Sequence, residues 1–201
     1  MNVVELRQYT LHPGKREVLI ELFERALIEP QEAAGMRILG QFRDLDRPDH
    51  FVWIRGFPDM ASRVEALSAF YGGPVWKAHR EAANATMIDS DDVLLLRPRT
   101  PVVGFPAARA EQSSTMVVAT ICPRPLEPEV APMLTEAGGR PLATLETEPA
   151  ENGYPALPVR TGENVVVWLT SFDSAEQGRL RRLPAQVQQL RLAPTARSHM
   201  R

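Results

Sequence analysis

An arginine lies within a strongly apolar stretch, HFVWIRGF, at residues 50–57. If this stretch is a β-strand, alternate side chains point to opposite faces. Arg55 then shares one face with Phe51, Trp53 and Phe57, so its guanidinium lies among aromatic rings and not in solvent. A guanidinium in such a place either pairs with a buried carboxylate or meets an anionic or carbonyl group of a ligand.

A second row of mixed side chains lies in VVELRQYTL at residues 3–11. Alternation places Glu5, Arg7 and Tyr9 on one face of this predicted strand. If the two strands are neighbours, Glu5 is the expected partner of Arg55, because an unpaired buried guanidinium is strongly unfavourable. Two interpretations stay open at this point. The pair is a bridge that fixes how two sheets dock, or Arg55 is an electrophilic clamp in a ligand site where Tyr9 donates a hydrogen bond.

His79 is a further candidate for acid–base chemistry. On a helix over about 75–85, Trp76, His79 and Ala83 recur at spacings of three and four and share a face, with Asn84 beside them. A histidine there could be a general base or a haem ligand. A packed, hydrogen-bonded histidine is the alternative. None of the other histidines, His12, His50 and His199, has a second ligand at metal spacing, so no protein-built zinc site is expected. No cofactor is expected.

The elements that position these residues follow from periodicity and turn residues in the first half. The predicted order is β-α-β-β-α-β, the ferredoxin-like arrangement. Pro30 is expected to stop the first helix, and Gly35 to end a short helical turn before the second strand. The predicted strands are 3–11, 37–45, 50–57 and 93–98, and the predicted helices are 15–28, 58–70 and about 75–85.

The pattern repeats in the second half. Trp53 and Phe57 match Trp168 and Phe172, four residues apart in both copies. The fold class is therefore α+β, with two tandem ferredoxin-like repeats that form a pseudo-dimer like a dimeric α/β barrel. The domains are a first repeat at 1–99, a linker at 100–113 and a divergent second repeat at 114–201. Within the second repeat we expect strands at 114–122, 140–149, 165–172 and 191–197, and helices at 127–137 and 173–190.

The two faces of the first sheet differ in composition. Val4 and Leu6 of the first strand, with Val52 and Ile54 of the third, form purely aliphatic rows. We expect these rows to face the helices. The mixed rows that contain Glu5, Tyr9, Trp53 and Arg55 are then expected to face the sheet of the second repeat.

Composition excludes several functional classes. The chain has 201 residues, 44% of them hydrophobic and 24% charged, and a net charge of −2, so no basic surface for nucleic acid is expected. No apolar run approaches the roughly 20 residues that cross a bilayer. The first residues lack the basic start and apolar core of a signal peptide. Together with a lone cysteine, Cys122, this predicts a cytoplasmic protein that does not bind membranes.

Several segments together resemble one known family. They are VELRQYTLHPGKR (4–16), the spacing G-x-x-x-x-G-x-F (35–42), WIRGFPDMASR (53–63), FYGGPVWKAHREAANATMID (70–89) and VLLLRP (93–98). The first half resembles the NIPSNAP domain of the dimeric α/β-barrel superfamily. The second half is similar only in its Trp168/Phe172 strand and its order of elements, and Thr170 stands where the first half has Arg55.

The resemblance implies a small ligand held between helices and sheet, because superfamily relatives include cofactor-free oxygenases, haem-degrading enzymes and isomerases. We therefore expect binding of a small apolar or carbonyl-bearing molecule, with a cofactor-independent monooxygenase or isomerase as the alternative. Its catalytic residues would be His79, Arg55 and Tyr9. A non-catalytic structural or interaction protein is a further alternative, and a homodimer is possible in each case. The expected ligand contacts are Trp53, Phe57, Glu5, Trp76 and Asn84.

Overall fold

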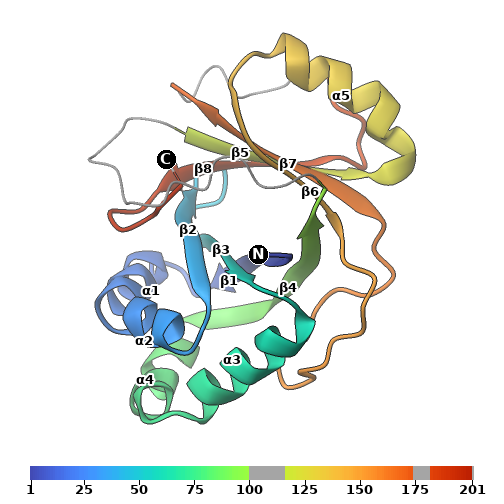
Figure 1. Ribbon diagram of the computed structural model, residues 1–201. Coiled ribbons are helices and arrows are strands. Elements are labelled where there is room, and N and C mark those ends of the chain that lie inside the picture. Colours follow the sequence, from blue (N-terminus) through green and yellow to red (C-terminus); the bar gives the residue numbers. More distant parts are fainter. Residues whose placement is uncertain (100–115, 174–181, 201) are drawn as a thin grey trace.

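The computed structural model describes residues 1–99, 116–173 and 182–200, and in these ranges the strands form one closed barrel (Figure 1). The strands are β1 (Val3–Leu11), β2 (Arg37–Asp44), β3 (His50–Phe57), β4 (Met87–Pro98), β5 (Met116–Pro123), β6 (Arg140–Thr147), β7 (Val165–Phe172) and β8 (Gln188–Pro194). Their order around the barrel is β1-β3-β2-β8-β5-β7-β6-β4, and each strand is antiparallel to its neighbours.

The N-terminal half has the predicted order β-α-β-β-α-β. Its four strands lie in the order β4-β1-β3-β2, and its helices cover the outer face of this sheet (Figure 1). The helical segments are α1 (Arg16–Leu22), the π-helical η1 (Phe23–Leu27), α2 (Ile28–Ala33), α3 (Met60–Gly72) and α4 (Pro74–Asn84). None of the helices in the described ranges has the length and apolar character needed to span a membrane.

The first helical segment continues past Pro30, so the expectation that this proline ends it is wrong. After α1 the helix widens into the π turn η1 and resumes as α2, which places Pro30 in the first turn of α2. Proline has no N–H to bond the carbonyl four residues back, and the π turn directly before α2 already interrupts that ladder. Gly35, at a φ of 99°, ends the segment in the left-handed region, as predicted.

The C-terminal half repeats the strand order of the first. Its strands lie in the order β8-β5-β7-β6, and the two sheets join where β2 pairs with β8 and β4 pairs with β6. The helices described here are the 3₁₀ turn η2 (Arg124–Leu126) and α5 (Glu127–Glu136). The predicted helix 173–190 is wrong at its end, because β8 begins at Gln188. Residues 182–187 of that prediction are not helical either, whereas residues 174–181 and the predicted linker 100–113 lie outside the described residues.

The two faces of the first sheet are used the opposite way from our expectation. Val4, Leu6, Val52 and Ile54 pack with aliphatic residues of β5, β7 and β8 and fill the barrel interior. The mixed row that contains Trp53 packs under the helices of its own half. The interior of an eight-stranded barrel is just wide enough for side chains to fill it, which favours compact aliphatic groups. The larger aromatic and guanidinium groups therefore occupy the layer between sheet and helices.

Candidate functional site

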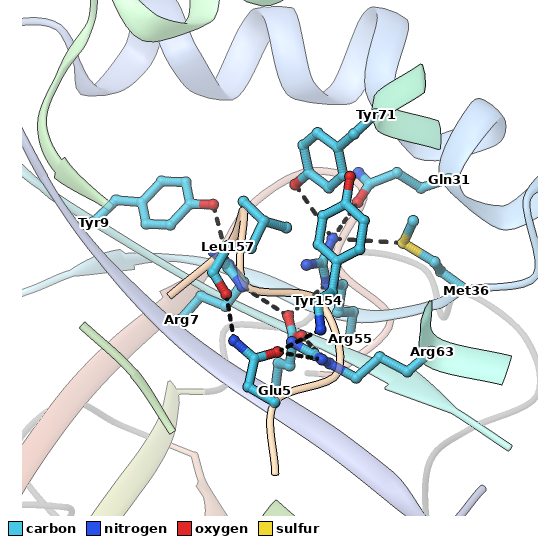
Figure 2. Close-up of polar contacts among 11 residues, drawn as sticks. Glu5, Arg7, Tyr9, Gln31, Met36, Arg55, Arg63, Tyr71, Tyr154 and Leu157 are labelled. Atoms are coloured by element: carbon cyan, nitrogen blue, oxygen red, sulfur yellow. Dashed lines mark hydrogen bonds and ion pairs between the residues drawn. The ribbon is translucent and has the colours of Figure 1, made fainter. Parts of the chain in front are cut away.

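Four charged side chains meet in the layer between the first sheet and its helices. We call Glu5, Arg7, Arg55 and Arg63 the Glu5 cluster (Figure 2). Glu5 Oε2 accepts hydrogen bonds from Arg55 Nε and Arg7 Nη1, each at 2.7 Å, and Glu5 Oε1 accepts from Arg63 Nε at 2.6 Å. Strand register explains the first contact, because Glu5 of β1 lies directly opposite Arg55 of β3. The predicted Glu5–Arg55 pair is thus confirmed.

The Glu5 cluster carries more positive than negative charge. Glu5, Arg55 and Arg63 have side chains that are 0% exposed, and Arg7 is 1% exposed. Three guanidinium groups therefore share a single carboxylate in a water-excluded layer. Burial alone would raise the pKa of Glu5, but the charges of Arg55, Arg7 and Arg63 outweigh it and hold the pKa well below its ordinary value.

Neutral polar groups complete part of the hydrogen bonding. Arg55 Nη1 donates to Gln31 Oε1 at 3.2 Å and lies 3.5 Å from the hydroxyl of Tyr71. Arg7 Nε donates to the Tyr9 hydroxyl at 3.1 Å, and Arg63 Nη1 donates to Asn152 Oδ1 at 2.9 Å. Arg55 Nη2 and Arg63 Nη2 are buried and find no hydrogen-bond partner among the described residues.

Aromatic rings surround the two strand-borne arginines. The guanidinium of Arg55 lies 4.9 Å from the ring centre of Trp53 and 5.5 Å from that of Phe57. The guanidinium of Arg7 lies 5.5 Å from the ring centres of Tyr9 and Trp53. The electron-rich ring faces attract the cations and offset part of their unbalanced charge. Arg55 can therefore lie in an aromatic strand because Glu5 pairs with its guanidinium and the neighbouring rings attract it.

A small apolar pocket adjoins the cluster. Its volume is about 30 Å³, far below the roughly 300–1,000 Å³ of ordinary ligand pockets. We call it the Tyr9 pocket, and it is lined by Tyr9, Leu19, Phe23, Leu27, Gln31, Trp53, Phe70, Tyr71, Trp76, Ala83 and Met87. Burial raises the pKa of Tyr9 despite the opposing charge of Arg7, so its hydroxyl keeps its proton at neutral pH. A ligand of ordinary size therefore needs the pocket to widen.

The structure brings together only some of the residues that the sequence singled out. Tyr9, Trp53 and Trp76 line the pocket, whereas Arg55, Glu5 and Phe57 lie next to it in the buried layer. His79 is partly exposed on α4, and Asn84 is exposed at the end of that helix. Neither lines the Tyr9 pocket. A catalytic role for His79 and a ligand contact for Asn84 stay predictions.

Sequence reasoning did not assign a site role to Arg63 or Asn152. Arg63 did leave a signal, because Ala66, Leu67 and Phe70 follow it at spacings of three, four and seven and are buried with it on one face of α3. Asn152 left none, since it reaches the cluster from a loop of the C-terminal half. Within the described ranges, no three His, Cys, Asp or Glu side chains are grouped as metal ligands.

The closed antiparallel barrel with outer helices defines the class of the fold, and solved structures share it. A putative monooxygenase from Fusobacterium nucleatum aligns with a TM-score of 0.62 at 10% identity, over 96% of this chain and 91% of its own. A putative monooxygenase from Lactobacillus acidophilus gives 0.58 at 12% identity, over 96% and 94%. These likenesses show the fold alone.

The family follows from the N-terminal half. Residues 4–101 match the family model of NIPSNAP, the family that the sequence motifs of this half indicated. A NIPSNAP family protein of unknown function from Agrobacterium tumefaciens is 20% identical, over 51% of this chain and 94% of its own, with a TM-score of 0.47. No curated protein matches the chain.

Proposed function

We propose that this protein binds a small molecule that joins an acidic or carbonyl oxygen group to an apolar part, in the layer between the first sheet and its helices. The observation that carries the proposal is the unbalanced charge of the Glu5 cluster. Three buried guanidinium groups face one carboxylate, and Arg55 Nη2 and Arg63 Nη2 have no partner among the described residues. A bound anion would supply the missing charge and the missing acceptors.

The energetics of burial support this proposal. A buried charge is costly unless it is paired and hydrogen-bonded, and a folded core gains little from extra arginines that exceed their partners. A planar guanidinium is suited to carboxylate oxygens, with which it forms short, strong hydrogen bonds. The cluster is therefore built at a cost that a ligand anion would offset.

The apolar part of the ligand would lie in the Tyr9 pocket. Tyr9, Phe23 and Trp53 present ring edges and faces to one another there, with ring centres 4.9 Å apart for Phe23 and Trp53 and 6.0 Å apart for Tyr9 and Trp53. Such an environment favours aromatic or aliphatic groups. Trp53 Nε1 is buried without a hydrogen-bond partner among the described residues and offers one further donor.

A cofactor-independent monooxygenase or isomerase activity is the second candidate. Its support is the protonated hydroxyl of Tyr9, which accepts from Arg7 and has its own proton free to donate. Such a pair could stabilise charge that develops on a carbonyl oxygen. The two structural neighbours are named putative monooxygenases, and for this chain that activity is only a candidate. A closed, non-catalytic domain is favoured instead by the small volume of the pocket.

Tandem duplication and a pseudo-dimer are also part of the proposal. Phe57 lies opposite Val3, and Trp53 lies opposite Arg7; Phe172 lies opposite Met116, and Trp168 lies opposite Thr120, in the same register. The equivalent of the Glu5–Arg55 pair is Val118–Thr170. The second repeat therefore keeps the framework without the charges. Because the barrel closes within one chain, a homodimer is not needed to complete it.

The experiment compares benzoate with benzamide, which has the same ring and no charge. We expect benzoate to raise the melting temperature of the wild type more than benzamide does, because a ligand of the native state stabilises it by mass action. Arg55→Met should abolish the benzoate effect. Arg43→Met should retain the benzoate effect, because Arg43 lies on β2 of the same sheet but pairs with Glu17 in an exposed position. Equal effects of the two probes, or none, would contradict the proposal.

A further inference from the structure

The loop between β6 and β7 covers the Glu5 cluster from the C-terminal half of the chain. This β6–β7 loop, residues 148–164, contains no helix or strand. It is longer than the roughly 12–15 residues above which such segments in compact domains are usually functional or disordered. Its backbone is tied to β4 at two points, where Glu148 N donates to Leu95 O and Arg160 N donates to Val93 O, each at 2.9 Å. Between these points its tip lies against α3, where Asn152 contacts Arg63.

Three side chains of the loop make the cover. Tyr154, Leu157 and Val159 pack against the same hydrophobic cluster as the Tyr9 pocket. The ring of Tyr154 stacks on Tyr71 with centres 6.3 Å apart, and Tyr71 in turn contacts Arg55. Figure 2 shows Tyr154 and Leu157 lying beside Arg55 and Arg7 in this view. The loop is thus a wall of the proposed site, although it belongs to the other repeat.

Asn152 joins the loop to the cluster. Its Oδ1 accepts from Arg63 Nη1 at 2.9 Å and from Tyr154 N at 3.1 Å, while its Nδ2 donates to Leu157 O at 2.8 Å. One amide therefore both folds the tip of the loop and engages a guanidinium of the cluster. It is a neutral group on a cation that lacks sufficient negative charge, so a carboxylate would be a stronger partner for Arg63.

The space around the loop allows it to move. A cavity of about 420 Å³ lies between the two legs of the loop and β4, lined by Leu95, Thr147–Asn152 and Val159–Glu163. The Tyr9 pocket itself has only about 30 Å³, so a ligand that also contacts the Glu5 cluster needs the surrounding wall to shift. Segments with few backbone hydrogen bonds open at lower free energy than strands and helices. The loop is accordingly the part of the wall that opens most readily.

We propose that the β6–β7 loop is a ligand-responsive cover of the Glu5 cluster, latched by Asn152 on Arg63, and that an acidic ligand displaces this latch. The proposal rests on the proposed function. In the free protein, Asn152 Oδ1 occupies the place beside Arg63 Nη1 that an oxygen of the bound ligand takes. Binding of the ligand releases the loop tip, and the strength of the latch sets the affinity.

The test uses three variants of the full chain with benzoate as the probe. Asn152→Ala removes the latch, and Asn152→Asp replaces it by a permanent carboxylate on Arg63. Ala156→Asp, at an exposed position of the same loop, adds the same charge away from the cluster. The readouts are benzoate affinity by calorimetry and hydrogen–deuterium exchange of peptides within 148–164 and within β3.

We expect affinity to rank Asn152→Ala above wild type and wild type above Asn152→Asp, with a loss of about tenfold or more in Asn152→Asp because a fixed carboxylate competes for Arg63. Ala156→Asp should equal wild type. Without ligand, hydrogen–deuterium exchange in the loop should be faster in Asn152→Ala than in wild type, and exchange in β3 should be the same in both. In wild type, benzoate should accelerate exchange in the loop. A purely structural asparagine would instead weaken binding when replaced by alanine.

The outcomes separate the two proposals. If benzoate binds the wild type but the variants rank otherwise, or the loop exchange does not respond, only the latch is overturned. If benzoate does not bind the wild type, the proposed function is overturned and the latch with it. Binding with the expected ranking and a response confined to the loop supports both.

Discussion

Glu5 bears the negative charge on which three buried guanidinium groups depend. Its two oxygens contact Arg7, Arg55 and Arg63 at 2.6–2.7 Å. The pairing of Glu5 with Arg55 could be predicted, because alternation in two neighbouring strands fixes which side chains lie opposite. The contacts of Arg63 and Asn152 could not, because they depend on how a helix and a distant loop dock on the sheet.

The first prediction concerns removal of this charge. Glu5→Gln leaves three buried cations without a counter-charge, so we expect it to lower the free energy of unfolding by about 3–5 kcal/mol. Glu17→Gln is the control, since Glu17 is 58% exposed and its pair with Arg43 should contribute less than about 1 kcal/mol. Urea unfolding measures both. Similar, small losses in the two variants would show that Glu5 does not hold the cluster together.

The second prediction concerns pH. The pKa of Glu5 is lower in the folded protein than in the unfolded chain because its arginine neighbours outweigh its burial. Its contribution to stability is therefore complete above the unfolded value of about 4.3 and is lost as pH falls through the lower folded value. The stability difference between wild type and Glu5→Gln should stay constant from about pH 7 to pH 5 and shrink below about pH 4. Denaturant unfolding across this range tests it, and a difference that grows on acidification contradicts it.

At the scale of elements, the order of strands and helices was predictable and their facing was not. Periodicity and turn residues placed the first three strands of the first half, because local patterns determine these elements, whereas β4 begins at Met87 and not at residue 93 as predicted. Both faces of the first sheet are buried, so alternation alone could not say which row meets the helices. For this reason the sequence-based expectation is wrong: the row that contains Val52 faces the barrel interior, and the row that contains Trp53 faces the helices. The π turn η1 carries no comparable sequence signal.

A glycine pair tests the element boundaries. Gly35 has a φ of 99° between α2 and β2, a conformation that costs other residues about 1–2 kcal/mol. Gly72 ends α3 without a positive φ, and a Cβ added there would meet open space. We expect Gly35→Ala to destabilise the protein by about that amount, and Gly72→Ala to be neutral or to stabilise it by up to about 1 kcal/mol. Unfolding curves that rank the two variants the other way contradict the assigned boundary.

At the scale of the whole molecule, the two halves close one barrel. The aliphatic side chains of both halves fill its interior. The edge strand β2 pairs with β8, and the edge strand β4 pairs with β6. In the second sheet, β8 lies at the edge that β4 takes in the first sheet, and β6 lies at the edge that β2 takes. The similar strand order of the second half could be suspected from Trp168 and Phe172, whereas the closure of the barrel depends on long-range pairing that no local pattern encodes.

Residues 1–99 expressed alone test this arrangement. Their β2 and β4 edges would be unpaired and their aliphatic face exposed, so we expect two copies to associate with β2 of one pairing with β4 of the other. Sedimentation velocity should find a dimer. A folded monomer would show that the first half does not need a second sheet.

The central claim is that the excess arginines serve a ligand and not the fold, and the melting temperature of Arg63→Met with and without benzoate tests it most directly. Arg63→Met removes a surplus buried cation together with the hydrogen bond to Glu5 Oε1, but Arg7 and Arg55 stay on Oε2, so we expect the unliganded variant to lose much less stability than Glu5→Gln does. Benzoate should then stabilise the wild type and not the variant. A variant that melts far below the wild type without ligand, and still responds to benzoate, would contradict the account.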